Sequence, residues 1–274
     1  MVNSAGKTRS RLKVLRTGDP RSAFQGWSPA EILAEYGAPR YLLSQSSKTE
    51  KCDKIGVLNR VLYLTSGVFC PAATEGCLRT CLGHGSGRMQ LPSSAIARDR
   101  RTALYLEDQK HFLELLRSEL HYVESTAKRW NKVPAVRLNG TSDIPWERLH
   151  RELFEEFPDI WFFDYTKILP RMKHFAQGGS TQASWPANYH LTFSHSEKSF
   201  GESLEFLSSG GNVAVVFEKE LPADHWGFRV IDGDTHDARF LDPQGVIVGL
   251  RAKGIAKKDR SGFVQRTNSL NKAA

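Results

Sequence analysis

The chain of 274 residues is poor in cysteine, with four, and in methionine, with three. It has no run approaching the roughly 18 apolar residues that read as a membrane-spanning helix, and its N-terminus lacks the apolar core of a secretory signal. We therefore expect a soluble, intracellular protein with no membrane partner. In a reducing compartment, closely spaced cysteines serve as ligands or catalytic groups more often than as disulfide partners.

Charge is distributed unevenly along the chain, whose formal net charge is +8. Residues 1–21 contain six basic side chains and one acidic one, and residues 251–274 contain seven and one, so the body between them carries −3. Basic ends of this kind can follow a phosphate backbone, which predicts salt-dependent binding of nucleic acid through the termini. Solvated terminal segments are the alternative interpretation.

Short apolar runs alternate with amphipathic stretches. Strands are expected over residues 55–66, 134–140, 159–166, 189–196, 212–218, 227–232 and 245–252. Helices are expected between Ser28 and Gly37 and near residues 92–130, 146–157, 169–177 and 200–207. This alternation predicts an α/β fold with mainly parallel strands. A complete or partial TIM-like (β/α) barrel with basic terminal extensions fits the pattern better than an open doubly wound sheet.

Three regions are expected along the chain. Residues 1–54 form a basic arm and a short helical lead-in, residues 55–252 form the barrel-like core that carries a cysteine-rich loop, and residues 253–274 form a basic C-terminal tail.

Polar residues follow nearly every predicted strand, at the end where barrels place their chemistry. The clusters after successive strands include Asn139, Gly140, Thr141 and Asp143, then Asp164 and Lys167, then His195, and later Asp234. Any one of these residues can cap a helix or form a turn. Their convergence predicts one shared site, with a small-molecule or macromolecular substrate bound in the mouth of the barrel.

Three of the four cysteines lie in the stretch FCPAATEGCLRTC, residues 69–81, with the spacing C-x6-C-x3-C. Thiolates bind soft metals, and iron–sulfur clusters take cysteine ligands from flexible loops. Glycines at 76, 83, 85 and 87 are expected to supply the flexibility. Cys70, Cys77 and Cys81 are therefore predicted to hold a [4Fe-4S] cluster with one iron left open.

Two alternatives remain for the cysteine loop. His84 follows Cys81 at a C-x2-H spacing, so the three cysteines and His84 can form a closed zinc site, and Cys52 can complete a four-cysteine set for either metal. Metal-free or redox-active thiols are the other alternative.

The layout of a three-cysteine loop after the first strand, a long helix, and a second strand ending in NGTSD (residues 139–143) resembles the radical S-adenosylmethionine superfamily. The resemblance implies that the three cysteines hold the cluster and that S-adenosylmethionine chelates the open iron. It also implies that Asn139, Gly140, Thr141 and Asp143 bind this second cofactor.

Three stretches resemble the gene-product-88 family of phage-encoded proteins: CPAATEGCLRTCLGHGSGRM (70–89), ARDRRTALY (97–105) and DGDTHDARFLDPQGVIVGLRAKG (232–254). This resemblance implies a phage origin, localisation in the host cytoplasm, and cluster-binding cysteines. It implies no particular reaction.

Two hypotheses of function follow. In the first, the protein is a radical S-adenosylmethionine-type enzyme, in which Asp164, Lys167, His195 and Asp234 orient substrate or move protons. In the second, it is a non-enzymatic metal-binding protein, carrying an iron–sulfur cluster or zinc, whose basic ends and Arg98, Arg100 and Arg101 grip nucleic acid or a host factor.

Overall fold

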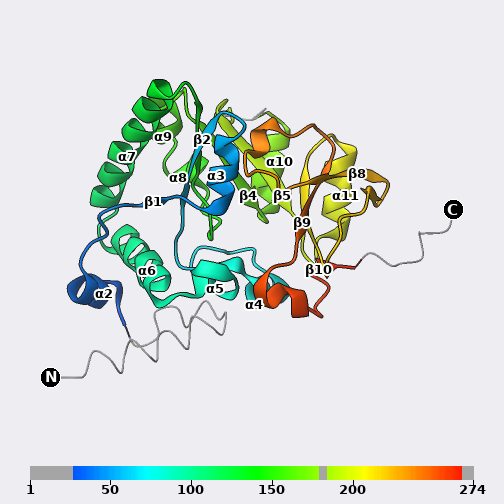
Figure 1. Ribbon diagram of the computed structural model, residues 1–274, viewed down its shortest axis with the longest axis horizontal. Coiled ribbons are helices and arrows are strands. Elements are labelled where there is room, and N and C mark those ends of the chain that lie inside the picture. Colours follow the sequence, from blue (N-terminus) through cyan, green and yellow to red (C-terminus); the bar gives the residue numbers. More distant parts are fainter. Residues whose placement is uncertain (1–26, 179–183, 267–274) are drawn as a thin grey trace.

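A mostly parallel sheet of ten strands carries the fold (Figure 1). The computed structural model describes residues 27–178 and 184–266. Within these residues the strand order is β1-β2-β3-β4-β5-β6-β9-β8-β7, with β10 beside β6, and the sheet is not closed into a ring. The pairs β1–β2 and β7–β8 are antiparallel, and the others are parallel. The predicted α/β class with mainly parallel strands is confirmed.

The strands are β1 (Leu43–Ser44), β2 (Val57–Leu62), β3 (Val133–Arg137), β4 (Trp161–Thr166), β5 (Tyr189–Ser194), β6 (Val213–Phe217), β7 (Asp224–His225), β8 (Phe228–Asp232), β9 (Ile247–Arg251) and β10 (Val264–Gln265). The α-helices are α2 (Pro29–Tyr36), α3 (Ser47–Asp53), α4 (Glu75–Thr80), α5 (Leu82–Gly85), α6 (Pro92–Glu107), α7 (Gln109–Arg129), α8 (Trp146–Leu149), α9 (Glu152–Glu156), α10 (Leu169–Ala176) and α11 (Phe200–Ser208). Short 3-10 helices are η2 (Gly87–Gln90), η3 (Arg239–Leu241) and η4 (Gly254–Lys258).

The expected long helix over residues 92–130 is two helices. It breaks at Asp108, whose side chain accepts a hydrogen bond from the backbone N–H of His111 at 3.0 Å and so caps α7. The predicted buried stripe on α7 is confirmed: Phe112, Leu116, Leu120 and Val123 are all buried. None of the helices in the described part of the chain combines the length and apolarity needed to cross a membrane.

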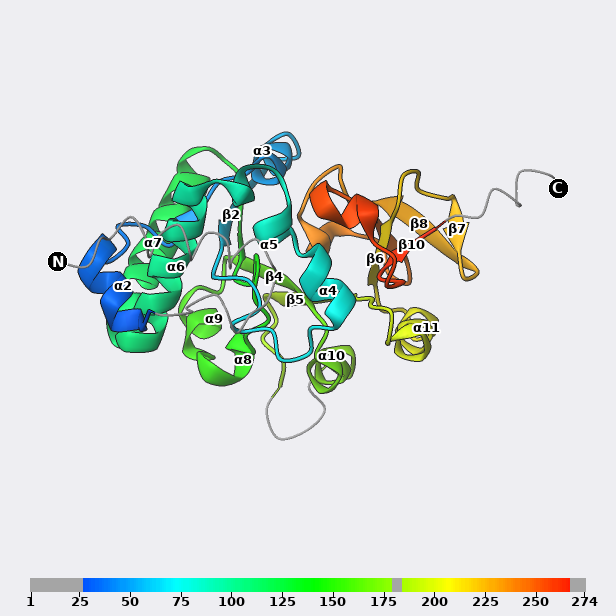
Figure 2. The same ribbon diagram turned by 90° about the horizontal axis from the view of Figure 1, so that it is seen from below.

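One face of the sheet packs against helices. Alternate strand residues such as Val136, Phe162 and Val215 share one large apolar core with α7, α9 and α11. Figure 2 shows α9, α10 and α11 along the same side of the strands. Strands β2 to β6 follow each other in chain order, and connections of constant hand keep the helices between them on one face.

The connection from β8 to β9 lies on the opposite face. It steps back along the sheet, because β9 lies between β6 and β8, and a connection of the same hand must then run over the other face. Phe240 of this connection stacks on Trp161 with 5.1 Å between ring centroids, and Ala238 packs with Ala135 and Phe163. The segment therefore covers the second face of the sheet near the amino ends of the strands.

The chain returns to the sheet in β10. Strand β5 pairs with β6 at Val213 and Ala214, whereas β10 pairs with β6 farther along, at Val216 and Phe217. Helix η4, which precedes β10, contacts α4 and α5. Residues 253–266, assigned from sequence to a basic tail, are thus part of the fold beside the cysteine loop.

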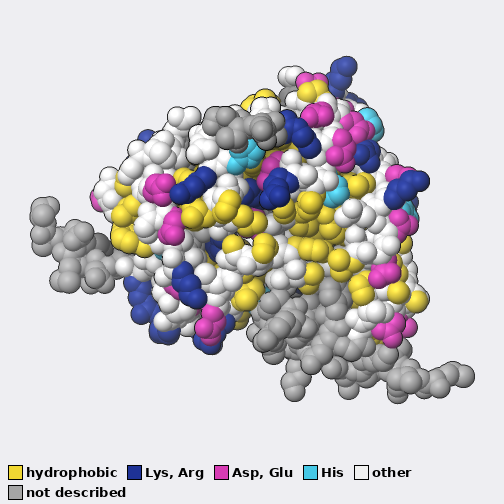
Figure 3. All heavy atoms as spheres, turned by 180° about the vertical axis from the view of Figure 1, so that it is seen from behind, with side chains coloured by type: hydrophobic (Ala, Val, Ile, Leu, Met, Phe, Trp, Pro, Cys, Tyr) yellow, Lys and Arg dark blue, Asp and Glu magenta, His cyan; other side chains and the backbone are white. Residues whose placement is uncertain are grey.

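Side chains of both charge signs occur on the surface. On the face in Figure 3, Lys and Arg as well as Asp and Glu side chains surround a central band of hydrophobic ones. The basic N-terminal segment expected from sequence, residues 1–21, lies outside the described residues, whereas six of the seven basic side chains of residues 251–274 lie within them.

Candidate functional site

A cavity of about 240 Å³ lies at the carboxyl ends of the parallel strands. Nine of the eleven residues singled out from sequence line it: Cys70, Cys77, Cys81, Asn139, Gly140, Thr141, Asp143, Lys167 and Asp234. Asp164 and His195 do not. Because the carboxyl ends of parallel strands meet at one edge, loops distant in sequence share this cavity.

The three cysteines of the loop share one electrostatic environment. Burial raises the pKa of Cys70 to about 12, and the neighbouring Cys81 and Cys77 also contribute to the increase. Burial likewise raises the pKa of Cys77, and the ammonium group of Lys167 opposes this increase. The Cys70 thiol donates to the carbonyl of Thr141 over 3.7 Å. The raised pKa values of Cys70 and Cys77 keep these two groups as thiols, and a positive partner such as a metal would favour their thiolate forms.

Neither candidate for a fourth zinc ligand lies with these cysteines in the cavity wall. Cys52 packs with Val57 and Ala135 near the amino ends of the strands, and the backbone N–H of Asp237 donates to its sulfur at 3.3 Å. His84 is buried in α5 and does not line the cavity. Across residues 27–178 and 184–266, no three His, Cys, Asp or Glu side chains are arranged to hold a single metal ion.

The loop glycines at 76, 83 and 85 serve close packing, which corrects the expectation that they make the loop flexible, whereas nothing lies within 4 Å of a Cβ atom built at Gly87. The loop contains two short helices, α4 and α5. A Cβ atom at Gly83 would lie 1.8 Å from Ser66 Oγ, and one at Gly76 would lie 2.3 Å from Ser261 Oγ. Since real Cβ atoms do not approach other atoms so closely, glycine is required where the cysteine loop meets the rest of the cavity wall.

Glu197 anchors the start of α4 although it was not among the predicted site residues. Its carboxylate accepts hydrogen bonds from Thr74 Oγ1 at 2.8 Å and from the backbone N–H of Gly76 at 2.9 Å. Thr74 Oγ1 in turn accepts from the backbone N–H of Cys77 at 3.3 Å. Glu197, which follows β5, therefore holds the helix that carries Cys77. In the sequence, only its position after a predicted strand pointed to such a role.

Replacing Glu197 by Ala is expected to loosen α4 while the fold persists, and to lower the amount of the metal that the cysteine loop is predicted to bind. Removing the carboxylate leaves the N–H of Gly76 and the hydroxyl of Thr74 without this acceptor, which costs about 1–3 kcal/mol locally. Metal analysis and circular dichroism would test this, with Glu220→Ala as the control, because Glu220 is exposed. A Glu197→Ala protein with wild-type metal content would contradict the anchoring role.

The segment NGTSD, residues 139–143, joins β3 to the cysteine loop. The backbone N–H of Gly140 donates to the carbonyl of Leu62 at 2.9 Å, and that of Asp143 donates to the carbonyl of Phe69 at 2.8 Å. Phe69 immediately precedes Cys70, so the position of this cysteine depends on NGTSD.

Gly140→Ala is expected to displace NGTSD and lower metal content. Its Cβ atom would lie 2.6 Å from Tyr63 Cδ1 and 2.7 Å from the carbonyl oxygen of Leu62, so the backbone must move at a cost of about 1–3 kcal/mol. Gly201→Ala in α11 is the matched control, because nothing lies within 4 Å of the added Cβ. It should stabilise the protein by about 0.5–1 kcal/mol. Chemical denaturation would measure the stability of both variants, and metal analysis would measure their metal content. Equal metal content in the two variants would show that Gly140 is not needed to position NGTSD.

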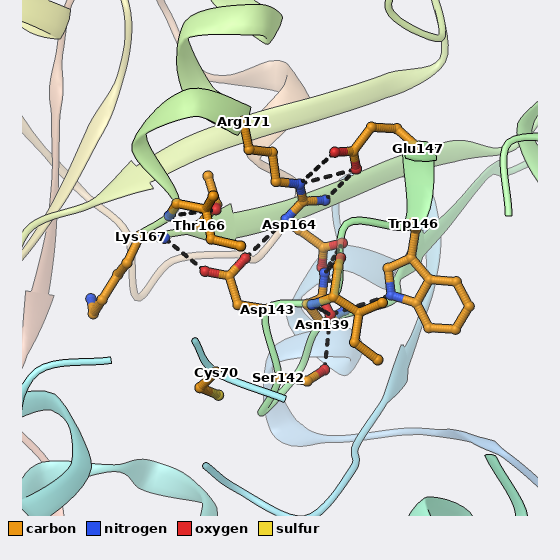
Figure 4. Close-up of polar contacts among 12 residues, drawn as sticks. Cys70, Asn139, Ser142, Asp143, Trp146, Glu147, Asp164, Thr166, Lys167 and Arg171 are labelled. Carbon is orange, nitrogen blue, oxygen red and sulfur yellow. Dashed lines mark hydrogen bonds and ion pairs between the residues drawn. The ribbon is translucent and has the colours of Figure 1, made fainter. Parts of the chain in front are cut away.

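Asp164 lies beneath the cavity, which makes it a positioning residue. It is fully buried and accepts hydrogen bonds from the backbone N–H of Asn139 at 2.6 Å, from Asn139 Nδ2 at 3.1 Å and from the Tyr189 hydroxyl at 2.7 Å. Asn139 Oδ1 in turn accepts from Ser142 Oγ, the N–H of Ile144 and Trp146 Nε1 (Figure 4). Burial raises the pKa of Asp164 to about 6. Asp164 was predicted to orient substrate or move protons; the structure places it outside the cavity wall, and that role stays a prediction.

Arg171 is the central cation of a buried network that the sequence did not reveal. Its guanidinium group donates to Asp143 Oδ1 at 3.0 Å and to both carboxylate oxygens of Glu147 at 3.0 and 3.1 Å (Figure 4). It also donates to the Tyr189 hydroxyl. Because Asp143 also accepts from the backbone N–H of Lys167 at 2.9 Å, the network joins NGTSD to the end of β4.

Lys167 and His195 differ in their access to the cavity. Lys167 Nζ lines it and donates to Ser194 Oγ at 2.6 Å and to the carbonyls of Ser194 and His195 at 3.1 and 3.2 Å. His195 is buried outside the cavity wall, with Nδ1 2.9 Å from Ser203 Oγ and its ring against Trp226. Burial, followed by the charge of Lys167, lowers the pKa of His195 to about 4. His195 was predicted to orient substrate or move protons; the structure places its neutral ring outside the cavity wall, and that role stays a prediction.

Asp234 lies in the cavity wall as one partner of ion pairs. Lys253 Nζ is 2.7 Å and Arg251 Nη1 3.5 Å from its carboxylate oxygens, and the backbone N–H of Arg251 donates to it at 3.1 Å. Free proton transfer by Asp234 is therefore constrained by two cations.

The three arginines of ARDRR bind their own chain. Arg98 is buried and donates to the carbonyl of Met89, while Arg100 and Arg101 donate to backbone carbonyls of Gly37, Ala38 and Tyr41. Their role here is to hold the lead-in segment and η2 against α6, which weakens the expectation that they grip nucleic acid or a host factor.

Comparison with known proteins adds one match. A family model described as Gene product 88 matches residues 41–267. No curated protein and no solved structure matches the chain. The matched range includes the whole sheet and every residue of the cavity wall.

Proposed function

The chain belongs to the gene product 88 family, and we propose that in this member Cys70, Cys77 and Cys81 hold a [4Fe-4S] cluster at the carboxyl ends of the strands. The observation that carries the proposal is that all three cysteines, from positions spread over α4 and its two flanks, line the same cavity as NGTSD and Lys167. Thiolate is the usual protein ligand of such clusters.

The arrangement suits a cluster better than a single zinc ion. Zinc needs four donors at about 2.0–2.3 Å from one point, whereas a cluster binds each thiolate through a different iron, so its ligands stand farther apart. Cys52 and His84 both lie outside the cavity wall. Three cysteine ligands leave one iron of the cluster open to an outside molecule.

We further propose that the sheet is a partial (β/α) barrel of the radical S-adenosylmethionine type. Support comes from the sequential order of β2 to β6, from the position of α7, α9 and α11 on one face of these strands, and from the cysteine loop after the first parallel strand. When bound, the cluster would supply one electron and an open coordination position. NGTSD would then hold the second cofactor, while Lys167 and Asp234 would orient the substrate in the cavity.

The position of each supporting residue follows from its contacts. The Arg171 network and Asp164 fix NGTSD from below, and Glu197 fixes α4 from the side. The cavity wall is therefore preorganised from several strands, as expected of a site that must hold a cofactor in one orientation.

Anaerobic purification tests the proposal. The protein is expected to be brown and to contain about four irons and four sulfides per chain. Dithionite and S-adenosylmethionine should then yield 5′-deoxyadenosine. Colourless protein with one zinc per chain would refute the cluster; brown protein that forms no 5′-deoxyadenosine would refute only the radical chemistry.

A further inference from the structure

Large apolar side chains are exposed at the amino ends of the strands. Five of them are between 39% and 53% exposed: Ile55, Trp130, Val133, Trp161 and Leu241. Figure 1 shows this end of β2, β3 and β4 on the side of the molecule opposite α4 and α5. Single apolar side chains on a surface are ordinary, whereas a contiguous patch of them marks a contact with another molecule.

Val133 lies beside Ile55. Its backbone N–H donates to the carbonyl of Gly56 at 2.9 Å, and β3 pairs in parallel with β2 from that point. Trp130, at the C-terminal end of α7, precedes Val133 by three residues and is joined to it through a turn in which Asn131 has a φ of 51°. These three exposed side chains therefore belong to the adjoining starts of β2 and β3.

Trp161 and Leu241 continue this surface on the side of β4. Ala135 is paired with Trp161, so Val133, two residues earlier in β3, points to the same face of the sheet as Trp161. The Trp161 ring stacks on Phe240 with 5.1 Å between ring centroids, and Leu241 is the next residue. The five exposed side chains thus form one surface, the amino-edge patch, across the starts of three neighbouring strands.

Charges of opposite sign flank the amino-edge patch on opposite sides. Lys54 follows α3 and Arg129 ends α7, and these helices contact β2, whereas Asp159 lies just before β4. All three side chains are exposed, and none has an ion-pair partner among residues 27–178 and 184–266. Lys132 and Asp53 neutralise each other at 2.7 Å. The patch is therefore basic on one side and acidic on the other.

We propose that the amino-edge patch binds a second copy of this chain about a two-fold axis. Such an axis places the apolar surface of one copy on that of the other, and it brings Lys54 and Arg129 of each copy toward Asp159 of the other. A surface that binds an unrelated protein needs no such match of opposite charges on its two sides. The cavity lies at the other end of the strands, so both copies keep it open, and dimer formation does not depend on a bound cluster.

Sedimentation equilibrium of the full-length protein at several concentrations tests the proposal. A dimer is expected, and Trp130→Glu, which places a charge within the apolar contact, should weaken it at least tenfold. Leu149→Glu is the matched control, because Leu149 is a comparably exposed apolar residue on α8, outside the patch. Circular dichroism of each variant would verify that it is folded.

A charge exchange tests the two-fold arrangement itself. Arg129→Asp and Asp159→Arg should each weaken the dimer, because like charges then face each other across the axis. Combining the two restores opposite charges and should return the dissociation constant to within about threefold of the wild-type value. A monomer at every concentration, dimerisation of Trp130→Glu equal to that of Leu149→Glu, or a double variant no better than either single one would overturn the proposal.

Discussion

Chains with Ala in place of Cys70, Cys77 or Cys81 are expected to be purified anaerobically without the brown colour. Each should fall from about four irons per chain to fewer than one, because a cluster with only two protein ligands is readily lost. The three thiols line one cavity and are held there by Glu197, Thr141 and NGTSD, so the loss of one is not compensated by another cysteine. Iron and sulfide analysis with visible absorption spectra would measure this.

Cys52→Ala is the matched control for these variants. Cys52 is fully buried, and it packs with Val57, Ala135 and Phe163 on the covered face of the sheet. Its replacement removes one sulfur from the core and should lower stability modestly while leaving iron content unchanged. Iron retained after loss of any loop cysteine, or lost with Cys52, would contradict the ligand assignment.

Arg171→Met is expected to destabilise the folded protein by about 3–5 kcal/mol, since it leaves buried carboxylates without their cation. Arg171 and Glu147 have side chains only 2% and 3% exposed, and Asp143 is 10% exposed. The effect should appear in urea denaturation as a lower midpoint, and NGTSD should lose its support, so metal content is expected to fall as well.

Arg79→Met provides the comparison, because Arg79 pairs with Glu75 on the surface, where both side chains are 69% exposed. A pair of this kind contributes about 0–1 kcal/mol, so its loss should barely move the urea midpoint. Equal midpoints for Arg171→Met and Arg79→Met would show that the buried network contributes no more than a surface pair.

The main strands were predictable because their apolar runs are short, regular and separated by amphipathic helices. Of the ten strands in the described residues, six fall within the expected ranges and β3 begins one residue before its range. The helix expected between Ser28 and Gly37 is α2, which begins with a capping box formed by Ser28 and Glu31. The missed strands β1, β7 and β10 are two residues long. Such elements owe their conformation to their neighbours in the sheet and carry no periodicity of their own.

The site was predictable as a region, because the carboxyl ends of parallel strands converge. The roles of single residues were not. Asp143 and Asp164 were both expected at the end of a strand, yet Asp164 lies inside β4 and is buried under the cavity, whereas Asp143 lines it. The importance of Arg171 arises from contacts with residues 18 to 28 positions away, which no local pattern encodes.

The place of β10 has a consequence for biosynthesis. This strand pairs with the far end of β6, and the residues just before it pack against the helices of the cysteine loop. This strand is translated after every other element described. The cysteine loop is therefore synthesised well before the residues that pack against it. If the cysteines hold the proposed cluster, iron and sulfide would enter before β10 is in place, while the thiols are still open to a delivery partner.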